Sequence, residues 1–339
     1  MVATSPRWSG QSTRRIAESG KKAPCLPIKI LLVYYENTMC GIAGYWKKSE
    51  SDEAPLGRTL LKMITALGCR GPDSTGVATY HRKRPGMWTA RVKLGDQGDF
   101  SARAAQISHA TSSAGAEEFS RTGPYLRFSL REQADPQPFL QSVESLAPDV
   151  EVVSLGSALE IVKQVGSPAN LESTFSISSF PGTHGIAHTR LSTESVVDLS
   201  HSQPFSAHAR PDLAIVHNGH ITNYHQLRRR YAQKGVRFYT ENDSEIVGIY
   251  LAMRLREGDG LQDALTRMLA DLDGSYSCLA ATESEFGFVR DPFALKPLCF
   301  TETDAFVAIA TEEIAIRAAF EGEYAVRETQ AKEVRVWRR

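Results

Sequence analysis

The sequence has few cysteines and no net charge, and each shortage excludes a class of protein. Only 5 cysteines occur among 339 residues and none forms a Cys-x-x-Cys pair, which argues against a disulfide framework or a thiolate zinc site. The 39 basic residues balance 39 acidic ones, so no overall charge attracts nucleic acid or an acidic membrane. We therefore expect a protein of the reducing cytoplasm.

Long apolar runs and phosphate-binding loops are also missing. The uninterrupted apolar run of the N-terminal segment, Ile30–Tyr35, is too short for a membrane span or a signal peptide. No Gly-rich phosphate loop or dinucleotide fingerprint occurs, so we expect no ATP, flavin or nicotinamide cofactor in this chain. With 42% hydrophobic residues, the chain can still form a large core.

Cys40 lies in the sequence Met39-Cys40-Gly41. If the bond before it is broken, one residue carries both a thiol and a free α-amine. An amine with a pKa of about 7.7–8.0 can accept the proton of a thiol with a pKa of about 8.5, so nucleophile and base share one residue. The alternative is a buried small hydrophobic side chain. The motifs that follow favour the catalytic interpretation.

Five short motifs occur in a characteristic order: Cys40–Gly44, Arg70–Gly76, His188–Thr193, His217–Gly219 and Asn242–Glu245. In this order they resemble the class II glutamine amidotransferases, the N-terminal-nucleophile glutaminases. Arg290–Pro292 and Lys296-Pro297 extend the resemblance over most of Cys40–Trp337. Within the family, the chain is most similar to the amidotransferase-like subunit of N-methylglutamate synthase, a relative of the glutaminase domain of glutamate synthase.

Hydrophobic periodicity predicts a mixture of helices and strands. Helical patterns lie at Leu56–Leu67, Tyr224–Lys234, Asp243–Arg254 and Leu261–Leu272, and strands at Gly76–Tyr80, Gly185–Thr189, Leu213–Val216, Ser275–Ala281, Phe286–Val289 and Ala305–Ala310. The resemblance implies a specific α+β fold, a four-layer αββα sandwich with two antiparallel sheets between helices.

We divide the chain into a leader, residues 1–39, and an amidotransferase domain, residues 40–339. The leader is a misassigned start, a cleaved pro-segment or a transit peptide, and we favour the first because Met39 stands where an initiator would. An insertion at about 95–182 is absent from compact members of the family. Its predicted strands, Tyr125–Leu130 and Val150–Leu155, flank a helix at Pro138–Leu146. A surface elaboration and a docking face for partner subunits remain equal interpretations.

The resemblance implies a catalytic group around Cys40, whose thiolate attacks the γ-amide of glutamine to give a thioester. The negative oxygen that develops would be stabilised by the Asn218 side-chain amide and the Gly219 backbone N–H, each contributing roughly 2.7–4 kcal/mol. Without the other motifs, Asn218-Gly219 would predict a turn after a strand. Arg70 and Asp73 are expected to brace the site through buried hydrogen bonds.

The resemblance also implies how the ends of the substrate are held. Arg190 would bind the α-carboxylate through paired charge-assisted hydrogen bonds, with help from the Thr193 hydroxyl. Asp243 would bind the α-ammonium group. A structural alternative exists for Asp243, because Asn242 and Glu245 resemble a helix-capping arrangement and acids are favoured in a first helical turn.

Four histidines, His184, His188, His217 and His220, raise the question of a metal site. His184 and His188 are four residues apart, but the residues between them read as a strand, where that spacing does not give the helical zinc pair. We therefore expect structural roles and no metal.

The resemblance implies that ammonia passes to a synthase on separate polypeptides, an FMN and iron–sulfur subunit with a β-helix subunit nearby. The donor is glutamine or a γ-glutamyl alkylamide such as γ-glutamylmethylamide. Two alternatives remain: an inactive amidotransferase-like scaffold, and an N-terminal-nucleophile amide hydrolase acting on a γ-glutamyl alkylamide.

Overall fold

The computed structural model describes residues 39–48, 55–192, 196–206 and 210–339, which all belong to one compact unit, Asn37–Arg339. Within these residues the strands form three sheets, and every pairing between strands is antiparallel. Residues 1–38 of the predicted leader lie outside the described residues, and so does Thr193.

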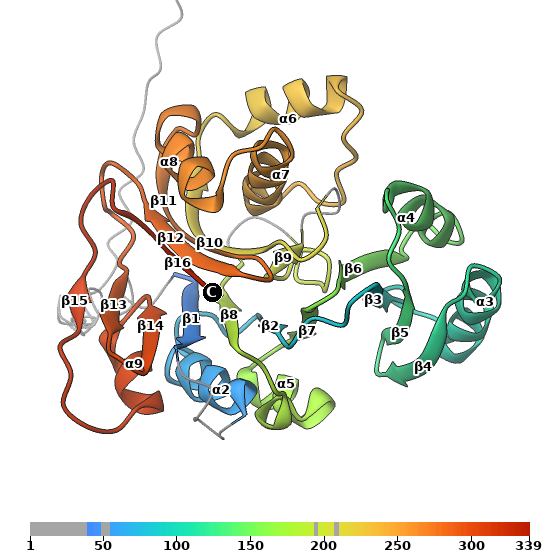
Figure 1. Ribbon diagram of the computed structural model, residues 1–339, viewed down its shortest axis with the longest axis horizontal. Coiled ribbons are helices and arrows are strands. Elements are labelled where there is room, and N and C mark those ends of the chain that lie inside the picture. The colour runs from blue at the N-terminus through green and yellow to red at the C-terminus, as the bar shows by residue number, and fades with distance from the viewer. Residues whose placement is uncertain (1–38, 49–54, 193–195, 207–209) are drawn as a thin grey trace, which may run out of the picture. The chain divides into compact units, whose positions relative to one another are not determined.

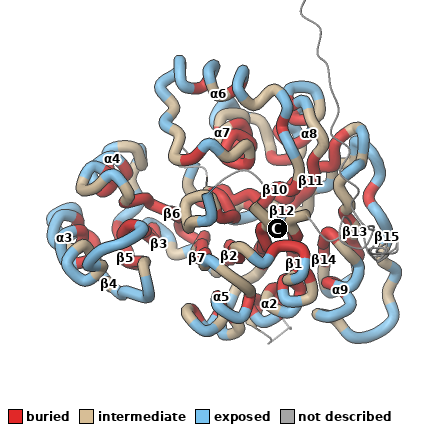
Figure 2. The backbone as a smooth tube through the Cα atoms, turned by 180° about the vertical axis from the view of Figure 1, so that it is seen from behind, coloured by how far each residue is buried: buried red, intermediate tan, exposed pale blue. Residues whose placement is uncertain are grey.

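The first sheet has seven strands in the order β15-β13-β14-β1-β8-β2-β7. Their bounds are Gly41–Lys47 (β1), Ser74–Tyr80 (β2), Leu159–Val165 (β7), His184–Arg190 (β8), Cys299–Glu302 (β13), Phe306–Ala310 (β14) and Arg327–Glu328 (β15). Three helices pack against it, α2 (Leu56–Ala66), α5 (Pro168–Phe175) and α9 (Glu313–Ala319), and a short 3-10 helix, Ile177–Ser179, precedes β8. β1, β2 and β8 are buried along their whole length, because both faces of the sheet are covered (Figure 2).

The second sheet has five strands in the order β16-β12-β11-β10-β9. Their bounds are Phe205–Ser206 (β9), Ala214–Ile221 (β10), Gly274–Ala281 (β11), Glu285–Arg290 (β12) and Val334–Arg338 (β16). The helices α6 (Tyr224–Gln233), α7 (Asp243–Arg256) and α8 (Leu261–Asp271) lie on its side of the molecule, away from α2 and α5 (Figure 1).

Alternation along β10 shows why two cores form. Ala214 and Val216 belong to the core between the two sheets, whereas Ile215, between them, belongs to the core under α7 and α8. Successive side chains of a strand point to opposite faces, so the second sheet is covered by the first sheet on one face and by helices on the other. The predicted αββα sandwich is confirmed.

The third sheet has four strands, β4-β5-β3-β6, and a separate core. Its elements are β3 (Met87–Lys93), α3 (Phe100–Ser112), β4 (Glu117–Thr122), β5 (Tyr125–Arg131), α4 (Gln137–Glu144) and β6 (Glu151–Gly156). This range begins and ends earlier than the insertion predicted at about 95–182. The difference arises because β7 pairs with β2 along its whole length and α5 contacts α2, so both belong to the sandwich.

Candidate active site

A cavity of about 880 Å³ brings together five of the predicted residues, Cys40, Arg190, Asn218, Gly219 and Asp243. The sheet register explains part of this arrangement. Gly41 at the start of β1 pairs with Thr189 near the end of β8, so Cys40 and Arg190 lie at the same edge of the first sheet. Thr193, the sixth predicted residue, lies outside the described residues.

Cys40 is half-buried, and its thiol donates to the Leu191 carbonyl oxygen at 3.6 Å. Burial raises the pKa of this thiol, and the positive charges of Arg190 and Lys296 act in the opposite direction. The Cys40 carbonyl oxygen accepts hydrogen bonds from Asn218 Nδ2 at 3.1 Å and Arg70 Nε at 3.5 Å. The Asn218 amide is therefore held directly beside the nucleophile.

Asn218 and Gly219 are inside β10, so this Asn-Gly pair is not a turn. Gly219 has φ +152°, and a Cβ at this position would lie 2.2 Å from the Ser275 carbonyl oxygen of β11. Only glycine fits such a position without strain. Glycine at position 219 therefore permits the backbone conformation that lies next to the Asn218 amide.

Arg190 is 4% exposed and donates from Nη1 to the Val196 carbonyl oxygen at 3.1 Å. Burial lowers the pKa of its guanidinium, which still remains charged because an arginine pKa starts above 12. Asp73 holds the same corner: its N–H donates to the Arg190 carbonyl oxygen at 3.0 Å, and its Oδ2 accepts from Ser192 N at 2.7 Å.

Arg70 pairs with Glu312 through Nη1 and reaches the Cys40 carbonyl oxygen through Nε. Its contacts, like those of Asp73, fit the bracing role that the sequence suggested.

Asp243 is the first residue of α7 and one of two acids, with Glu241, that line the cavity. Its Oδ2 accepts from Ile221 N at 2.9 Å, and its Oδ1 lies 3.8 Å from His217 Nδ1. Asn242 caps the helix, accepting from Ser244 N at 2.9 Å. An acid in a first helical turn is stabilised by the helix dipole, so the capping and substrate-binding interpretations of this segment are compatible.

Glu245 does not complete the capping box that the sequence suggested. Its carboxylate accepts from Tyr239 N at 2.7 Å and from Thr240 N at 2.9 Å, and also from the Thr240 hydroxyl. It therefore fixes the loop before α7, which lines the cavity.

Sequence reasoning missed three residues beside the site, Gln203, Ser244 and Lys296. Gln203 accepts from His217 N at 2.6 Å through Oε1 and donates to His217 O at 2.9 Å through Nε2. It also reaches the Ser244 hydroxyl at 3.1 Å, which itself contacts His217 Nδ1 at 2.9 Å. Gln203 and Ser244 together join β10 to α7. No spacing in the sequence marks Gln203, and the motif Asn242–Glu245, which contains Ser244, does not indicate its contact with His217.

Lys296 lines the cavity, and its Nζ lies 3.2 Å from the Met39 sulfur. The sequence offered a signal for it, because Lys296-Pro297 is part of the family pattern, but the motif did not place it beside Cys40.

Two of the four histidines, His217 and His220, line the Cys40 cavity, whereas His184 and His188 do not. His184 contacts the Thr282 carbonyl oxygen through Nε2 at 2.7 Å, and burial lowers its pKa to about 3. His188 is fully buried, and burial likewise lowers its pKa to about 3, so both rings are neutral near pH 7. Among the residues that the structure covers, no group of three or more His, Cys, Asp or Glu could hold a metal, and no helix is long and apolar enough to cross a membrane.

The fold is shared with solved enzymes of purine synthesis. The glutamine phosphoribosylpyrophosphate amidotransferase from B. subtilis, solved with ADP and GMP, matches with a TM-score of 0.58 and 18% identity, over 88% of this chain and 47% of that chain. A structure described as the allosteric regulatory enzyme of purine biosynthesis matches with a TM-score of 0.56 and 19% identity, over 88% and 47%. The chain spans about half the length of these proteins, and the likeness concerns the fold alone.

Sequence comparison supplies the family. Residues 188–318 match the glutamine amidotransferase domain. The chain is 36% identical over 279 residues to the glutamine amidotransferase-like protein GlxB of Rhizobium meliloti, covering 82% of this chain and 91% of that protein. It is 32% identical over 306 residues to a putative glutamine amidotransferase of Methanothermobacter thermautotrophicus, covering 88% and 99%. The chain belongs to the class II glutamine amidotransferases, the family its motifs resemble.

Proposed function

We propose that this chain is the glutaminase subunit of a larger enzyme, hydrolysing the γ-amide of glutamine through a Cys40 thioester and passing ammonia to a separate synthase subunit. The observation that carries the proposal is the single cavity that contains a thiol, an amide donor, a cation and an anion: Cys40, Asn218, Arg190 and Asp243. A nucleophile, a donor to the developing oxyanion and one partner for each charged end of the substrate together suit hydrolysis of an amino-acid side-chain amide.

The reaction begins when the Cys40 thiol transfers its proton to the α-amine of the same residue. The thiolate attacks the γ-carbonyl carbon, and the Asn218 amide and Gly219 N–H stabilise the negative oxygen. The α-ammonium then gives its proton to the leaving nitrogen, so ammonia departs and a γ-glutamyl thioester remains. Water, deprotonated by the same amine, hydrolyses the thioester to glutamate and regenerates the thiol.

Substrate recognition relies on two charged residues of the cavity, Arg190 and Asp243. Arg190 holds the substrate α-carboxylate and Asp243 holds the α-ammonium group, with the Thr193 hydroxyl assisting Arg190. A cation and an anion that bind the two opposite charges of a zwitterion fix its orientation as well as its affinity. The thiol then faces the one uncharged end of the substrate, the γ-amide.

Removal of the residues before Cys40 is part of the proposal. While Met39 is attached, the Cys40 nitrogen belongs to a peptide bond and cannot act as a base. Met39 also lines the cavity and contacts Lys296. Both observations favour a mature chain that begins at Cys40.

The partners follow from the resemblance to N-methylglutamate synthase and glutamate synthase. We expect an FMN and iron–sulfur synthase subunit with a β-helix subunit, in the cytoplasm. The donor is glutamine or a γ-glutamyl alkylamide.

Intact mass and a glutaminase assay on the same purified sample test the proposal. We expect a mass that begins at Cys40 together with release of glutamate and ammonia from glutamine. A chain that starts at Cys40 but releases neither would instead support the inactive scaffold. Release of methylamine from γ-glutamylmethylamide, at a higher kcat/KM than release of ammonia from glutamine, would identify the alkylamide as the donor.

A further inference from the structure

A second cavity, of about 800 Å³, lies where the third sheet meets the sandwich. It is lined by the segment after β2, by β3, β5 and β7, and by residues 180–183 before β8. None of its lining residues lines the Cys40 cavity. Nothing in amide hydrolysis uses these residues, so the cavity requires its own explanation.

Two arginines of this cavity stand directly opposite each other. Arg91 of β3 pairs with Arg127 of β5 in the register of the third sheet. Like charges directly opposite on neighbouring strands are destabilising. An anion between them is therefore needed.

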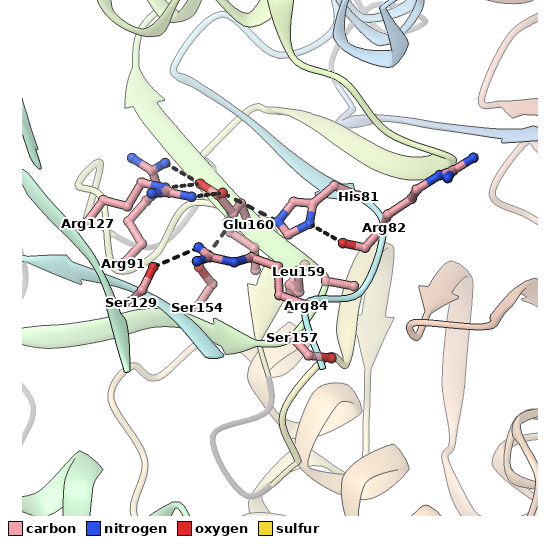
Figure 3. A network of polar contacts seen from close by, with 12 residues as sticks. His81, Arg82, Arg84, Arg91, Arg127, Ser129, Ser154, Ser157, Leu159 and Glu160 are labelled. Atoms are coloured by element: carbon pink, nitrogen blue, oxygen red, sulfur yellow. Dashed lines mark hydrogen bonds and ion pairs between the residues drawn. The ribbon is translucent and has the colours of Figure 1, made fainter. Parts of the chain in front are cut away.

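Glu160 of β7 supplies one such anion (Figure 3). Its carboxylate accepts from Arg91 Nη2 at 2.7 Å and from Arg127 Nε and Nη2 at 2.9 and 2.8 Å. His81 Nε2 lies 3.5 Å from the same group. Burial acts to raise the pKa of Glu160, but these three partners hold it well below its ordinary range. One negative charge thus faces two guanidinium groups and an imidazole, which leaves the group positive.

Arg91 gives a second sign that an anion is missing. Its side chain is 6% exposed, and its Nε has no hydrogen-bond partner. Leaving a buried donor unpaired costs about 1–3 kcal/mol, and more for a charged group. A ligand oxygen in the cavity would supply the missing acceptor.

The walls of the cavity indicate the size and character of the ligand. A volume of about 800 Å³ is within the range of small-molecule sites, roughly 300–1,000 Å³. Phe180 and Pro181 form part of the lining and offer apolar surface to an organic group. Arg84 stands at the same cavity, where its Nη1 is held by Glu118 at 2.9 Å and by Ser129 at 3.0 Å.

We propose that this cavity binds a small molecule carrying a phosphate group, with the phosphate between Arg91 and Arg127 and the organic part against Phe180 and Pro181. Planar guanidinium groups bind phosphate oxygens through paired hydrogen bonds. Arg91 and Arg127 carry two positive charges against the one negative charge of Glu160, and Lys47, Arg82 and Arg339 also line the cavity. The two charges of a phosphate therefore suit it better than the one charge of a carboxylate. The site is independent of the proposed glutaminase reaction.

Titration calorimetry on the full chain tests this at pH 8, with inorganic phosphate, phenyl phosphate and citrate as probes at constant ionic strength. We expect both phosphate probes to bind. Tighter binding of phenyl phosphate would identify an organic phosphate as the ligand, and equal binding would identify the phosphate group alone. Tighter binding of citrate than of either phosphate probe would overturn the proposal, as would no binding by any of the three.

Variants locate the binding. Arg127→Gln should weaken phenyl phosphate binding by about tenfold or more, because it removes charge-assisted hydrogen bonds to the phosphate. Arg82→Gln, at an exposed residue of the lining, should weaken it less. Lys83→Gln is the matched control, since Lys83 is the adjacent exposed cation, is paired with Glu283 and does not line the cavity. A loss in Lys83→Gln as large as that in Arg127→Gln would mean binding by general surface charge and would refute the site.

Glu160→Gln should change the affinity for phenyl phosphate in the opposite direction. It removes the carboxylate that competes for Arg91 and Arg127, so we expect a lower Tm without ligand, tighter phenyl phosphate binding and a larger rise in Tm when phenyl phosphate is added. A merely structural arginine pair would show the lower Tm without the tighter binding, and that outcome contradicts the proposal.

Discussion

The two cavities of this protein arrange charge in different ways. Around Cys40, the cation and the anion proposed to hold the substrate, Arg190 and Asp243, belong to separate elements, β8 and α7, and Arg228, Lys296 and Glu241 also line that cavity. In the second cavity, Arg91 and Arg127 share a single carboxylate, Glu160. Separated opposite charges suit a zwitterion with a neutral reacting end, whereas gathered like charges suit an anion. The comparison shows that charge placement, rather than cavity size, distinguishes the two sites, since both are close to the same volume.

The largest expected effect on activity comes from removing the nucleophile. Cys40→Ala should abolish glutamine hydrolysis while the fold remains, because no other cysteine among the described residues lines the cavity. Cys69→Ala is the matched control, since Cys69 is exposed and outside the cavity, and it should keep full activity. The measurements are glutamate release and thermal unfolding. Full activity in a chain that retains residues 1–39 would show that the N-terminal amine is not the base.

Asn218→Ala should lower kcat by about 10²–10³ with little change in KM, because its amide meets charge that develops only in the transition state. Steady-state kinetics with glutamine checks this. Asn218 also donates to the Cys40 carbonyl oxygen, so the unfolding temperature of the variant must be measured alongside. A loss confined to KM would contradict the oxyanion role.

Asp243→Asn isolates charge from structure, because the amide oxygen can still accept from Ile221 N. We expect weaker capture of glutamine by about 1.5–3 kcal/mol in kcat/KM, the value of a hydrogen bond to a charged group. Glutaric acid monoamide, which lacks the α-amine, should be insensitive to this change but sensitive to Arg190→Ala. Equal sensitivity of both substrates to both variants would move substrate recognition to other residues.

The sequence predicted much of the fold, and its failures have physical causes. β10 and β11 alternate between two cores, and α2 presents Leu56, Leu60, Met63 and Ile64 to one core, so periodicity revealed them. β1 was missed although β2 and β8, which are equally buried along their whole length, were predicted. It contains two glycines, Gly41 and Gly44, among its seven residues, and glycine is depleted in strands. α3 buries only Ala104, Ile107 and Thr111, too few apolar residues to make a visible stripe.

The same reasoning separates the two cavities. Cys40, Asn218 and Asp243 were predicted because each belongs to a short motif of a known family. Gln203 acts through bonds to the backbone of His217, a role that no local pattern marks. Arg91 and Arg127 meet through the pairing of β3 with β5, and Glu160 reaches them from β7 of the first sheet, so their sequence neighbours say nothing about them.

Gln203→Ala should destabilise the link between β10 and α7. It removes two hydrogen bonds to His217 and leaves buried backbone groups unpaired, an effect of about 1–3 kcal/mol. Chemical denaturation measures it. Gln233→Ala, at an exposed position of α6, is the matched control and should cost far less. Equal losses in both variants would show that the bonds to His217 contribute nothing.

The smallest expected effect concerns His81 in the second cavity. Contact with Glu160 raises the pKa of His81 above its ordinary value of 6.5, while burial and the Arg127 charge act against it, and the Arg82 carbonyl oxygen is its other neighbour. A raised pKa means that the folded protein favours the charged ring. The stabilisation is therefore complete below about pH 6.5 and is lost as the pH rises through the folded pKa. His81→Gln should lower the free energy of unfolding by about 0.5–1 kcal/mol at pH 5.5 and by much less at pH 9.

His109→Gln, at an exposed position on α3 outside the cavity, should show no such difference. An equal loss for His81→Gln at both pH values would mean that the ring acts by packing and that Glu160 is balanced by its arginines alone.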